Sequence, residues 1–249
     1  MGLEPVERIG TLKSIRRYPV KSMAGEDLQE ARVTFAGLLG DRVYAFVDNN
    51  NESDFPWLTG RQAHELILFH PHWANTLSAG DGIPHMDQYA IDVRTPDGKE
   101  FRVGDENFTR FLEQRFGRSL RLRFSERSMT DARPVSILGL STLHTLSQET
   151  GIELDPRRFR ENFYVEWREN RPFFEDELVG RELQIGDTAI LQVVKKDGRC
   201  VMTTLDPDTA QSSPQVLETI SCAHGGCVGV YGAVLREGVV RVNDLICVV

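Results

Sequence analysis

Cys200 is the residue whose sequence neighbours point most directly to chemistry. It follows Lys195, Lys196 and Arg199, and it precedes a short apolar stretch. Nearby cations favour the thiolate form of a cysteine, which is both a nucleophile and a soft ligand for a transition metal. A buried structural cysteine is the alternative, and the residue types alone leave the two interpretations open.

Several short basic segments could supply an anion site for such a centre. Lys21 and Ser22 follow a predicted strand that ends at Tyr18-Pro19, and Arg42 follows a glycine turn. Three arginines lie between residues 157 and 160, just before Asn162. Lys and Arg side chains with a nearby hydroxyl suit the oxygen atoms of a phosphate. Together these segments predict one anion pocket on an otherwise acidic protein.

The composition excludes several classes of protein. The chain has 249 residues, and 29 Lys and Arg against 37 Asp and Glu give a formal net charge of −8. This acidic balance argues against a broad nucleic-acid surface. No apolar run approaches the roughly 20 residues of a membrane span, and residues 1–10 lack the apolar stretch of a signal peptide. We therefore expect a cytoplasmic protein that binds neither membrane nor nucleic acid, with reduced thiols.

Common motifs add little. The sequence has no phosphate-binding loop of the P-loop type and no nucleophile elbow. Cys222, His224 and Cys227 offer too few ligands for a zinc site, so core or surface roles are favoured. The three consecutive acids that begin at Glu175 are typical of a solvated turn.

The predicted elements that must position these residues are mostly short strands. Helices are predicted from Asp105 to about Phe116, from Ser141 to Gly151, and from about Pro214 to Cys222. The last two strands read as a hairpin around Glu237-Gly238. Long loops at 49–56 and 75–88 could border a site. The pattern indicates a mixed α/β, mainly β fold, with two domains at 1–125 and 126–249 that meet in a polar stretch without periodicity.

Six blocks, in order along nearly the whole chain, resemble the MOSC family, named after the C-terminal domain of molybdenum-cofactor sulfurases. The last block is the closest match. The blocks are Tyr18-Pro-Val-Lys-Ser22, Gly37-Leu-Leu-Gly-Asp-Arg42 with Val47-Asp48, Leu58-Thr-Gly-Arg-Gln62, Arg158-Phe-Arg-Glu-Asn162, Pro172-Phe-Phe-Glu-Asp176 with Ile185-Gly186, and Arg199-Cys-Val-Met-Thr-Thr-Leu-Asp-Pro-Asp-Thr209.

This resemblance implies a β-barrel MOSC domain packed with a β-rich N-terminal domain, and a molybdenum cofactor (molybdenum–molybdopterin) between them. It implies that Cys200 is the thiolate ligand to molybdenum and that Asp206 lies beside the metal. Family-level descriptions also include pyridoxal phosphate binding. The cofactor contacts that the resemblance implies are Lys21, Ser22 and Arg42 for the phosphate, Arg160 and Asn162 for the pterin, and Ser141 and Thr142 as donors at a helix N-terminus.

The implied activity is the reduction of small N-hydroxylated compounds, as in the amidoxime-reducing subgroup. The sequence departs from the family pattern at Gly198, where many members have a second cysteine, and at Glu161, where they have proline. No four-cysteine ferredoxin pattern is present, so we expect electrons from a separate reductase or ferredoxin-like protein. Two alternatives remain open: a sulfur carrier that uses a Cys200 persulfide, and a non-catalytic cofactor-binding protein.

Overall fold

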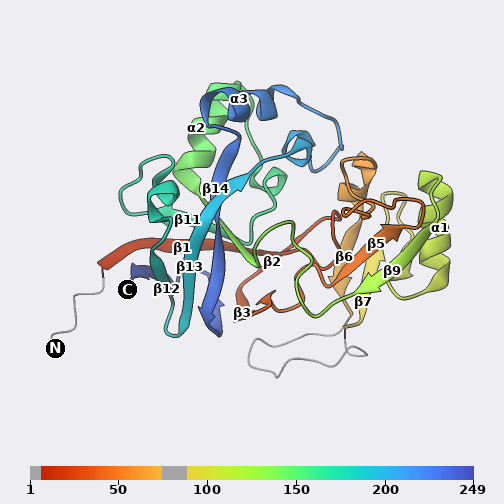
Figure 1. Ribbon diagram of the computed structural model, residues 1–249, viewed down its shortest axis with the longest axis horizontal. Coiled ribbons are helices and arrows are strands. Elements are labelled where there is room, and N and C mark those ends of the chain that lie inside the picture. Colours follow the sequence, from red (N-terminus) through yellow and green to blue (C-terminus); the bar gives the residue numbers. More distant parts are fainter. Residues whose placement is uncertain (1–6, 75–88) are drawn as a thin grey trace.

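The computed structural model describes residues 7–74 and 89–249 (Figure 1). The predicted loop at 75–88 lies outside the described residues. The described chain contains a closed barrel of seven strands and three α-helices, which confirms a mixed, mainly β fold. Among the described residues, no helix is long and apolar enough to cross a membrane. The cytoplasmic location stays a prediction.

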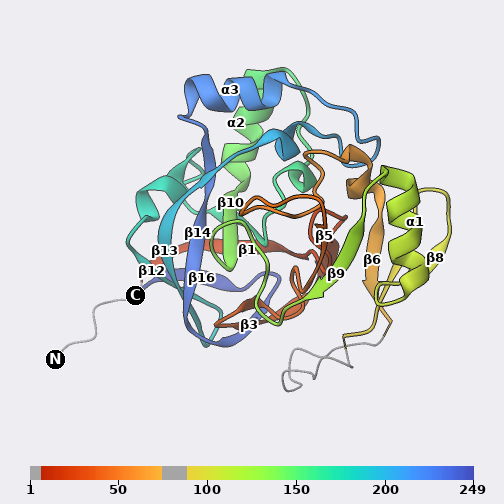
Figure 2. The same ribbon diagram turned by 45° about the vertical axis from the view of Figure 1, so that its right-hand side comes forward.

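The barrel is built from strands of both halves of the chain (Figure 2). Its strands follow the order β11-β10-β14-β13-β12-β16-β1, and β1 pairs with β11 to close it. Neighbours are antiparallel except β10 and β11, which are parallel. The barrel strands are β1 (Glu7–Arg17), β10 (Val135–Gly139), β11 (Phe163–Trp167), β12 (Glu182–Ile185), β13 (Ala189–Gly198), β14 (Cys227–Arg236) and β16 (Leu245–Val248).

Strands of the first half also pair with the end of the chain. Strand β2 (Glu26–Leu28) extends the sheet from β1, and β3 (Glu30–Thr34) lies between β4 (Gly37–Leu38) and β15 (Gly238–Arg241). The predicted hairpin around Glu237-Gly238 is therefore wrong, because β14 pairs with β10 and β13 while β15 pairs with β3. The predicted division at residue 125 stays a prediction, and β1 already belongs to the barrel.

The rest of the first half forms a second layer beside the barrel. Here β5 (Tyr44–Asp48) pairs with β9 (Leu120–Phe124), and β6 (His70–Trp73), β7 (Ile91–Arg94) and β8 (Glu100–Arg102) form a small sheet. Helix α1 (Glu106–Phe116) buries Phe108 and Leu112, and Gly117 ends it in the left-handed conformation, as predicted. The apolar core of this second layer is separate from the apolar core of the barrel.

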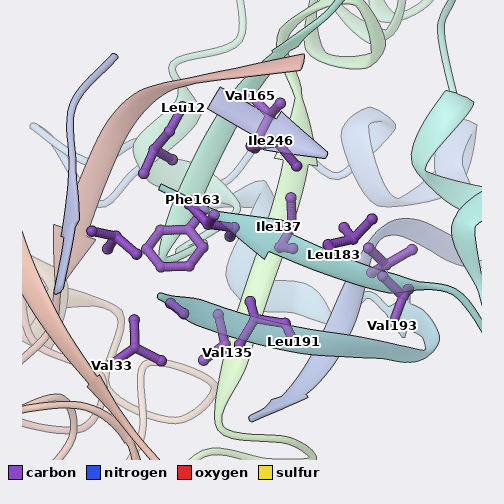
Figure 3. Packing of buried hydrophobic residues seen from close by; sticks show 14 of the residues in the cluster. Leu12, Val33, Val135, Ile137, Phe163, Val165, Leu183, Leu191, Val193 and Ile246 are labelled. Atoms are coloured by element: carbon purple, nitrogen blue, oxygen red, sulfur yellow. The ribbon is translucent and has the colours of Figure 1, made fainter. Parts of the chain in front are cut away.

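Alternation of apolar side chains explains the barrel interior (Figure 3). In β13, Ala189, Leu191 and Val193 are buried, while the residues between them are partly exposed. Such a period of two directs every second side chain to the core. The facing strands contribute Leu12, Ile137, Phe163, Val165, Leu183 and Ile246 to the same cluster.

The other two helices pack together outside the barrel (Figure 1). Helix α2 (Leu140–Thr150) ends at Gly151 in the left-handed conformation, as predicted, and α3 (Gln215–Ala223) follows a proline. Short 3-10 turns complete the fold and carry several polar residues of the site. They are η1 (His64–Leu68), η3 (Pro156–Arg158), η4 (Phe174–Leu178) and η5 (Val201–Thr204).

Candidate functional site

A cavity of about 310 Å³ lies among residues of both halves of the chain, and we refer to it as the cationic cavity. Seven of the described residues that line it are Lys or Arg, and two are Asp. This excess of cations contrasts with the net charge of −8 for the whole chain. The charged lining residues are Lys21, Arg42, Arg61, Arg158, Arg160, Lys195, Arg199, Asp131 and Asp197.

Cys200 lines this cavity between the end of β13 and the start of η5. Its carbonyl oxygen accepts hydrogen bonds from the backbone N–H and the hydroxyl of Thr203, each at 3.0 Å. These contacts fix the turn that carries the thiol. Lys195 and Arg199 line the same cavity, whereas Lys196 forms an ion pair with Asp176 at 2.7 Å and does not line it. Two of the three cations noted in the sequence therefore share a cavity with the thiol.

Lys21 and Ser22 line the cavity just after β1 and are both buried. The Lys21 ammonium donates to the carbonyl oxygen of Met129 at 2.8 Å and lies 2.5 Å from the Asp131 carboxylate. Asp131 also pairs with Arg61 at 3.1 Å. Burial lowers the pKa of Lys21, and the Asp131 carboxylate opposes that shift. One carboxylate of the chain thus holds two of the cavity cations.

Arg42 and Arg160 flank the aromatic ring of Tyr18. Their guanidinium carbons lie 4.6 Å and 4.4 Å from the ring centroid. Arg42 pairs with Asp41 at 2.5 Å and donates to the carbonyl oxygen of Arg160 at 2.8 Å. Arg160 has no carboxylate partner among the described residues, and its buried Nη2 lacks any hydrogen-bond partner there. Burial lowers the pKa of Arg160 to about 10, so the side chain is still a cation at neutral pH.

The backbone around the cavity is strained at three residues that line it. Ser22, Arg42 and Arg160 have φ angles of 65°, 49° and 58°. A non-glycine residue in this left-handed region costs on the order of 1 kcal/mol. Such strain persists only where the surrounding structure holds the residue in place, and it is common at ligand sites.

Arg199 organises the wall beside Cys200. Its guanidinium donates to the carbonyl oxygens of Val228 and Phe159 at 2.8 Å and 2.9 Å. It also contacts two buried carboxylates, those of Glu161 and Asp197. One guanidinium cannot neutralise both, and burial raises the pKa of Asp197 to about 7. Glu161, where the family pattern has proline, does not line the cavity and instead pairs with Arg199.

Asn162 and Asp206, two further predicted site residues, do not line the cavity. The Asn162 side chain accepts from the backbone N–H and hydroxyl of Ser136 and donates to the carbonyl oxygen of Arg16. Asp206 accepts from Arg158 at 3.0 Å and from backbone N–H groups of its own turn. Asp206 therefore positions Arg158, and Asn162 ties β11 to β10 and β1.

Ser141 and Thr142 also lie away from the cationic cavity. The Ser141 hydroxyl donates to the carbonyl oxygen of Arg171, and the Thr142 hydroxyl accepts from the backbone N–H of Phe173. The anion at the N-terminus of α2 is a carboxylate of the chain itself. Glu175 accepts from the backbone N–H of Gly139 at 3.1 Å and from Trp167 Nε1 at 3.0 Å.

The prediction of a solvated turn at the three acids is thus wrong for its first residue. Glu175 is fully buried, whereas Glu177 is exposed and pairs with Arg171. A Cβ atom on Gly139 would lie 2.7 Å from the Glu175 carboxylate, so the glycine makes room for it. These donors at the helix N-terminus are therefore already taken by a carboxylate of the chain.

Three titratable residues of the cavity were missed in the sequence: Asp131, Asp197 and Tyr231. Asp131 lies in the polar stretch that was assigned to a domain boundary. Asp197 lies in β13 among charged residues, and Tyr231 lies in a strand-like glycine-containing run. A polar residue within an otherwise apolar strand was the available signal for Tyr231, whereas the charged neighbours of Asp197 hid any such signal. Among the described residues, no cluster of three or more His, Cys, Asp or Glu side chains could hold a metal.

Comparisons with known proteins cover nearly the whole chain. The model of the MOSC N-terminal beta barrel domain matches residues 9–121, and that of the MOSC domain matches residues 125–246. Mitochondrial amidoxime reducing component 2 of Bos taurus is 24% identical, over 96% of this chain and 83% of its own length. Mitochondrial amidoxime-reducing component 1 of Homo sapiens is 26% identical, over 86% of this chain and 72% of its own length.

A solved structure shares the fold. The YUAD protein from Bacillus subtilis superposes with a TM-score of 0.50 at 12% sequence identity, and the match covers 98% of both chains. At this identity the likeness concerns the fold alone. The six sequence blocks, the closed barrel and the two matching domain models agree with one another. The chain belongs to the MOSC family and combines the MOSC N-terminal beta barrel domain with the MOSC domain.

Proposed function

We propose that this protein binds a molybdenum–pterin cofactor in the cationic cavity and reduces small N-hydroxylated compounds. One observation carries the proposal. Cys200 lines the same cavity as seven Lys and Arg residues, one of which, Arg160, has a buried nitrogen without a partner. The names of the relatives, amidoxime reducing components, support the choice of substrate class.

The residues of the cavity fit such a group. A pterin phosphate is a dianion that needs cationic donors, and Lys21, Arg42 and Arg160 provide them from three separate segments. Ser22 lies beside them and offers a hydroxyl. Cys200 supplies a soft sulfur donor of the kind that molybdenum accepts. The buried Arg160 Nη2 has no hydrogen-bond partner among the described residues, so an external acceptor would satisfy it.

When bound, a molybdenum–pterin group supplies two-electron chemistry in which an N–OH compound loses its oxygen. The chain contributes the setting for that step. Lys21, Ser22, Arg42 and Arg160 would hold the phosphate and pterin, and Cys200 would hold the metal. Asp197 lines the cavity with a pKa of about 7, so its carboxyl group can hold or release a proton near neutral pH. Electrons would come from a separate reductase or ferredoxin-like protein.

Metal analysis of protein from a host that makes the cofactor tests this proposal. We expect about one molybdenum per chain in the wild type and almost none in Cys200→Ala, because the metal loses its thiolate ligand. Cys222→Ala is the matched control, since Cys222 is exposed in α3 and lies outside the cavity. It should keep its molybdenum.

Activity completes the test. Reduction of an amidoxime by a chemical electron donor should follow molybdenum content across the three proteins. Absence of molybdenum from the wild type would overturn the proposal. A labile sulfur on Cys200, detected by mass spectrometry in that molybdenum-free protein, would favour the sulfur carrier instead.

A further inference from the structure

A second cavity, of about 490 Å³, adjoins the cationic cavity, and we refer to it as the arginine cavity. Arg158, Arg160 and Met202 line both cavities and so form their shared wall. The volume of the arginine cavity is within the range of small-molecule sites. The residues that line only this cavity include Arg16, Tyr18, Ala24, Gly25, Asp27, Ile67, His70, Asp155, Pro156, Arg157, Leu205 and Pro207.

Three arginines of this cavity have buried nitrogen atoms without hydrogen-bond partners among the described residues. They are Nε of Arg16, Nε of Arg158 and Nη2 of Arg160. Arg16 and Arg158 are themselves 8% and 5% exposed. A buried donor without an acceptor costs roughly 1–3 kcal/mol, so a group of three needs an explanation. An acceptor that enters the cavity would remove that cost.

The carboxylates of the cavity are already engaged. Asp155 accepts from the backbone and side chain of Arg157, which also pairs with Asp208 at 2.7 Å. Asp27 pairs with Nη1 of Arg16 at 3.2 Å, which leaves Nε of that residue free. Arg160 has no carboxylate partner in the described part of the chain. Arg158 pairs with Asp206 at 3.0 Å, so among these arginines the unmet demand is one negative charge, opposite Arg160, and acceptors for the unpaired nitrogens.

Apolar side chains line another part of the cavity. Ala24 and Ile67 come from the first half of the chain, and Leu205 and two prolines come from the second. A ligand with a charged head and an apolar body would satisfy both parts of this lining. Guanidinium groups hold planar carboxylates and phosphates through paired N–H bonds.

We propose that the arginine cavity is a binding site for a small organic anion, held by its carboxylate or phosphate group against the unpaired Nε atoms of Arg16 and Arg158, with the Arg160 cation in the wall that this site shares with the cationic cavity. The site is separate from the position of Cys200, which lines only the cationic cavity. The inference stands on the unpaired Nε atoms of Arg16 and Arg158, because Arg160 is also assigned to the cofactor, and it does not depend on the identity of that cofactor. The apolar lining favours an anion with a hydrocarbon body over a bare inorganic ion.

His70 provides a local reporter for the test, because it lines the arginine cavity and not the cationic cavity. Its imidazole carbon signal can be followed by NMR in ¹³C-histidine-labelled full-length protein and assigned with His70→Gln. Benzoate is the probe for a carboxylate with an apolar body, and inorganic phosphate is the probe for a bare oxyanion. Sodium chloride at equal ionic strength corrects for screening.

We expect benzoate to shift the His70 signal in a saturable way and to bind more tightly than inorganic phosphate. Arg16→Met should weaken benzoate binding about tenfold or more, because a charge-assisted hydrogen bond is lost. Arg17→Met is the matched control. Arg17 is the next residue of β1 and equally buried, but it contacts Glu26, the Leu39 carbonyl oxygen and Trp73, and it lines neither cavity.

Absence of a saturable His70 shift in the wild-type protein would overturn the proposal, whichever variants fold. The proposal would also fail if Arg16→Met kept wild-type affinity for benzoate. Should Arg16→Met not fold, Arg158→Met replaces it with the same expected loss, since its Nε is also unpaired. Tighter binding of phosphate than of benzoate would overturn the assignment to an organic anion.

Discussion

Two regions of this molecule bring together the donors that attract an anion, and they meet that demand in opposite ways. At the N-terminus of α2, the chain supplies the anion itself, as the buried carboxylate of Glu175. In the cationic cavity, seven Lys and Arg residues face two Asp residues, and Arg160 has no carboxylate partner in the described structure. The first region is complete in the free protein, and the second is not.

The difference teaches how a structural site can be told from a binding site. A carboxylate with donors on both oxygen atoms stabilises the fold and leaves nothing for a ligand. The buried Arg160 cation without a carboxylate partner, and the left-handed backbone at Ser22, Arg42 and Arg160, cost stability in the free protein. A ligand that fits recovers that cost. Substitutions at the α2 N-terminus should therefore mainly lower stability, and substitutions in the cationic cavity should mainly change the affinity for a ligand.

The largest expected effect concerns the pH dependence of stability that the cationic cavity imposes. Burial raises the pKa of Asp197 from 3.8 to about 7, so the folded state holds that proton more tightly than the unfolded state. The resulting stabilisation is complete below about pH 4 and is lost as the pH rises through about 7. Asp197→Asn should remove this loss, which is at most about 4 kcal/mol.

Thermal and chemical unfolding of ligand-free protein between pH 5 and pH 8 measures the effect. The variant should gain stability relative to the wild type as the pH rises. Asp187→Asn, a change at an exposed carboxylate, should leave the pH profile unaltered. Parallel profiles for the wild type and Asp197→Asn would show that the cavity cations keep this carboxylate charged throughout.

The α2 terminus should show the reverse pattern, a large loss of stability without an effect on ligands. Glu175→Ala leaves Trp167 Nε1 and the backbone N–H of Gly139 buried without an acceptor. We expect a loss of about 3 kcal/mol in the free energy of unfolding, measured with urea. Phosphate binding in the cationic cavity should be unchanged. Glu177→Ala, at an exposed surface pair on the same turn, should cost less than 1 kcal/mol.

The sequence was informative where a side chain that lines the cationic cavity lies in a short motif beside a predicted strand. Lys21, Arg42 and Cys200 belong to short motifs whose turns could be read locally, and all three line one cavity. The α2 helix was also predicted with its terminal glycine. What could not be read was the partner of its N-terminus, because Glu175 lies 36 residues after Gly139 and only the folded chain brings them together.

Irregular strands account for the other residues that were missed. The pairing of β13 with β14 shifts register three times, twice between Val193 and Gly198. Each shift changes which face the following side chain takes, so alternation cannot place Asp197. The predicted hairpin of the last two strands was wrong because local sequence does not show a distant pairing partner. A tight turn favours a hairpin, but β15 finds its partner in β3, about 200 residues earlier in the chain.

A smaller effect should separate Arg160 from its neighbours in the cationic cavity. Arg160→Met removes a cation whose Nη2 has no acceptor, so the affinity for inorganic phosphate should fall about thirtyfold while stability does not decrease. Calorimetric titration and urea unfolding measure the two quantities on the same sample. Lys196→Met is the control, because that cation pairs with Asp176 outside the cavity. A loss of stability with unchanged phosphate affinity would make Arg160 a structural residue like Glu175.

Asp131 offers the finest test of the comparison, because this cavity carboxylate complements two cavity cations much as Glu175 complements the donors at α2. It pairs with Lys21 at 2.5 Å and with Arg61 at 3.1 Å, yet 42% of its side chain is exposed. A half-exposed carboxylate forms a weaker complement than a buried one and can be displaced. Asp131→Asn removes a negative charge beside two cations, and we expect phosphate to bind about tenfold more tightly. Weaker binding in the variant would mean that Asp131 holds Lys21 and Arg61 in position for the ligand, in which case the cavity is preorganised by its own acid rather than blocked by it.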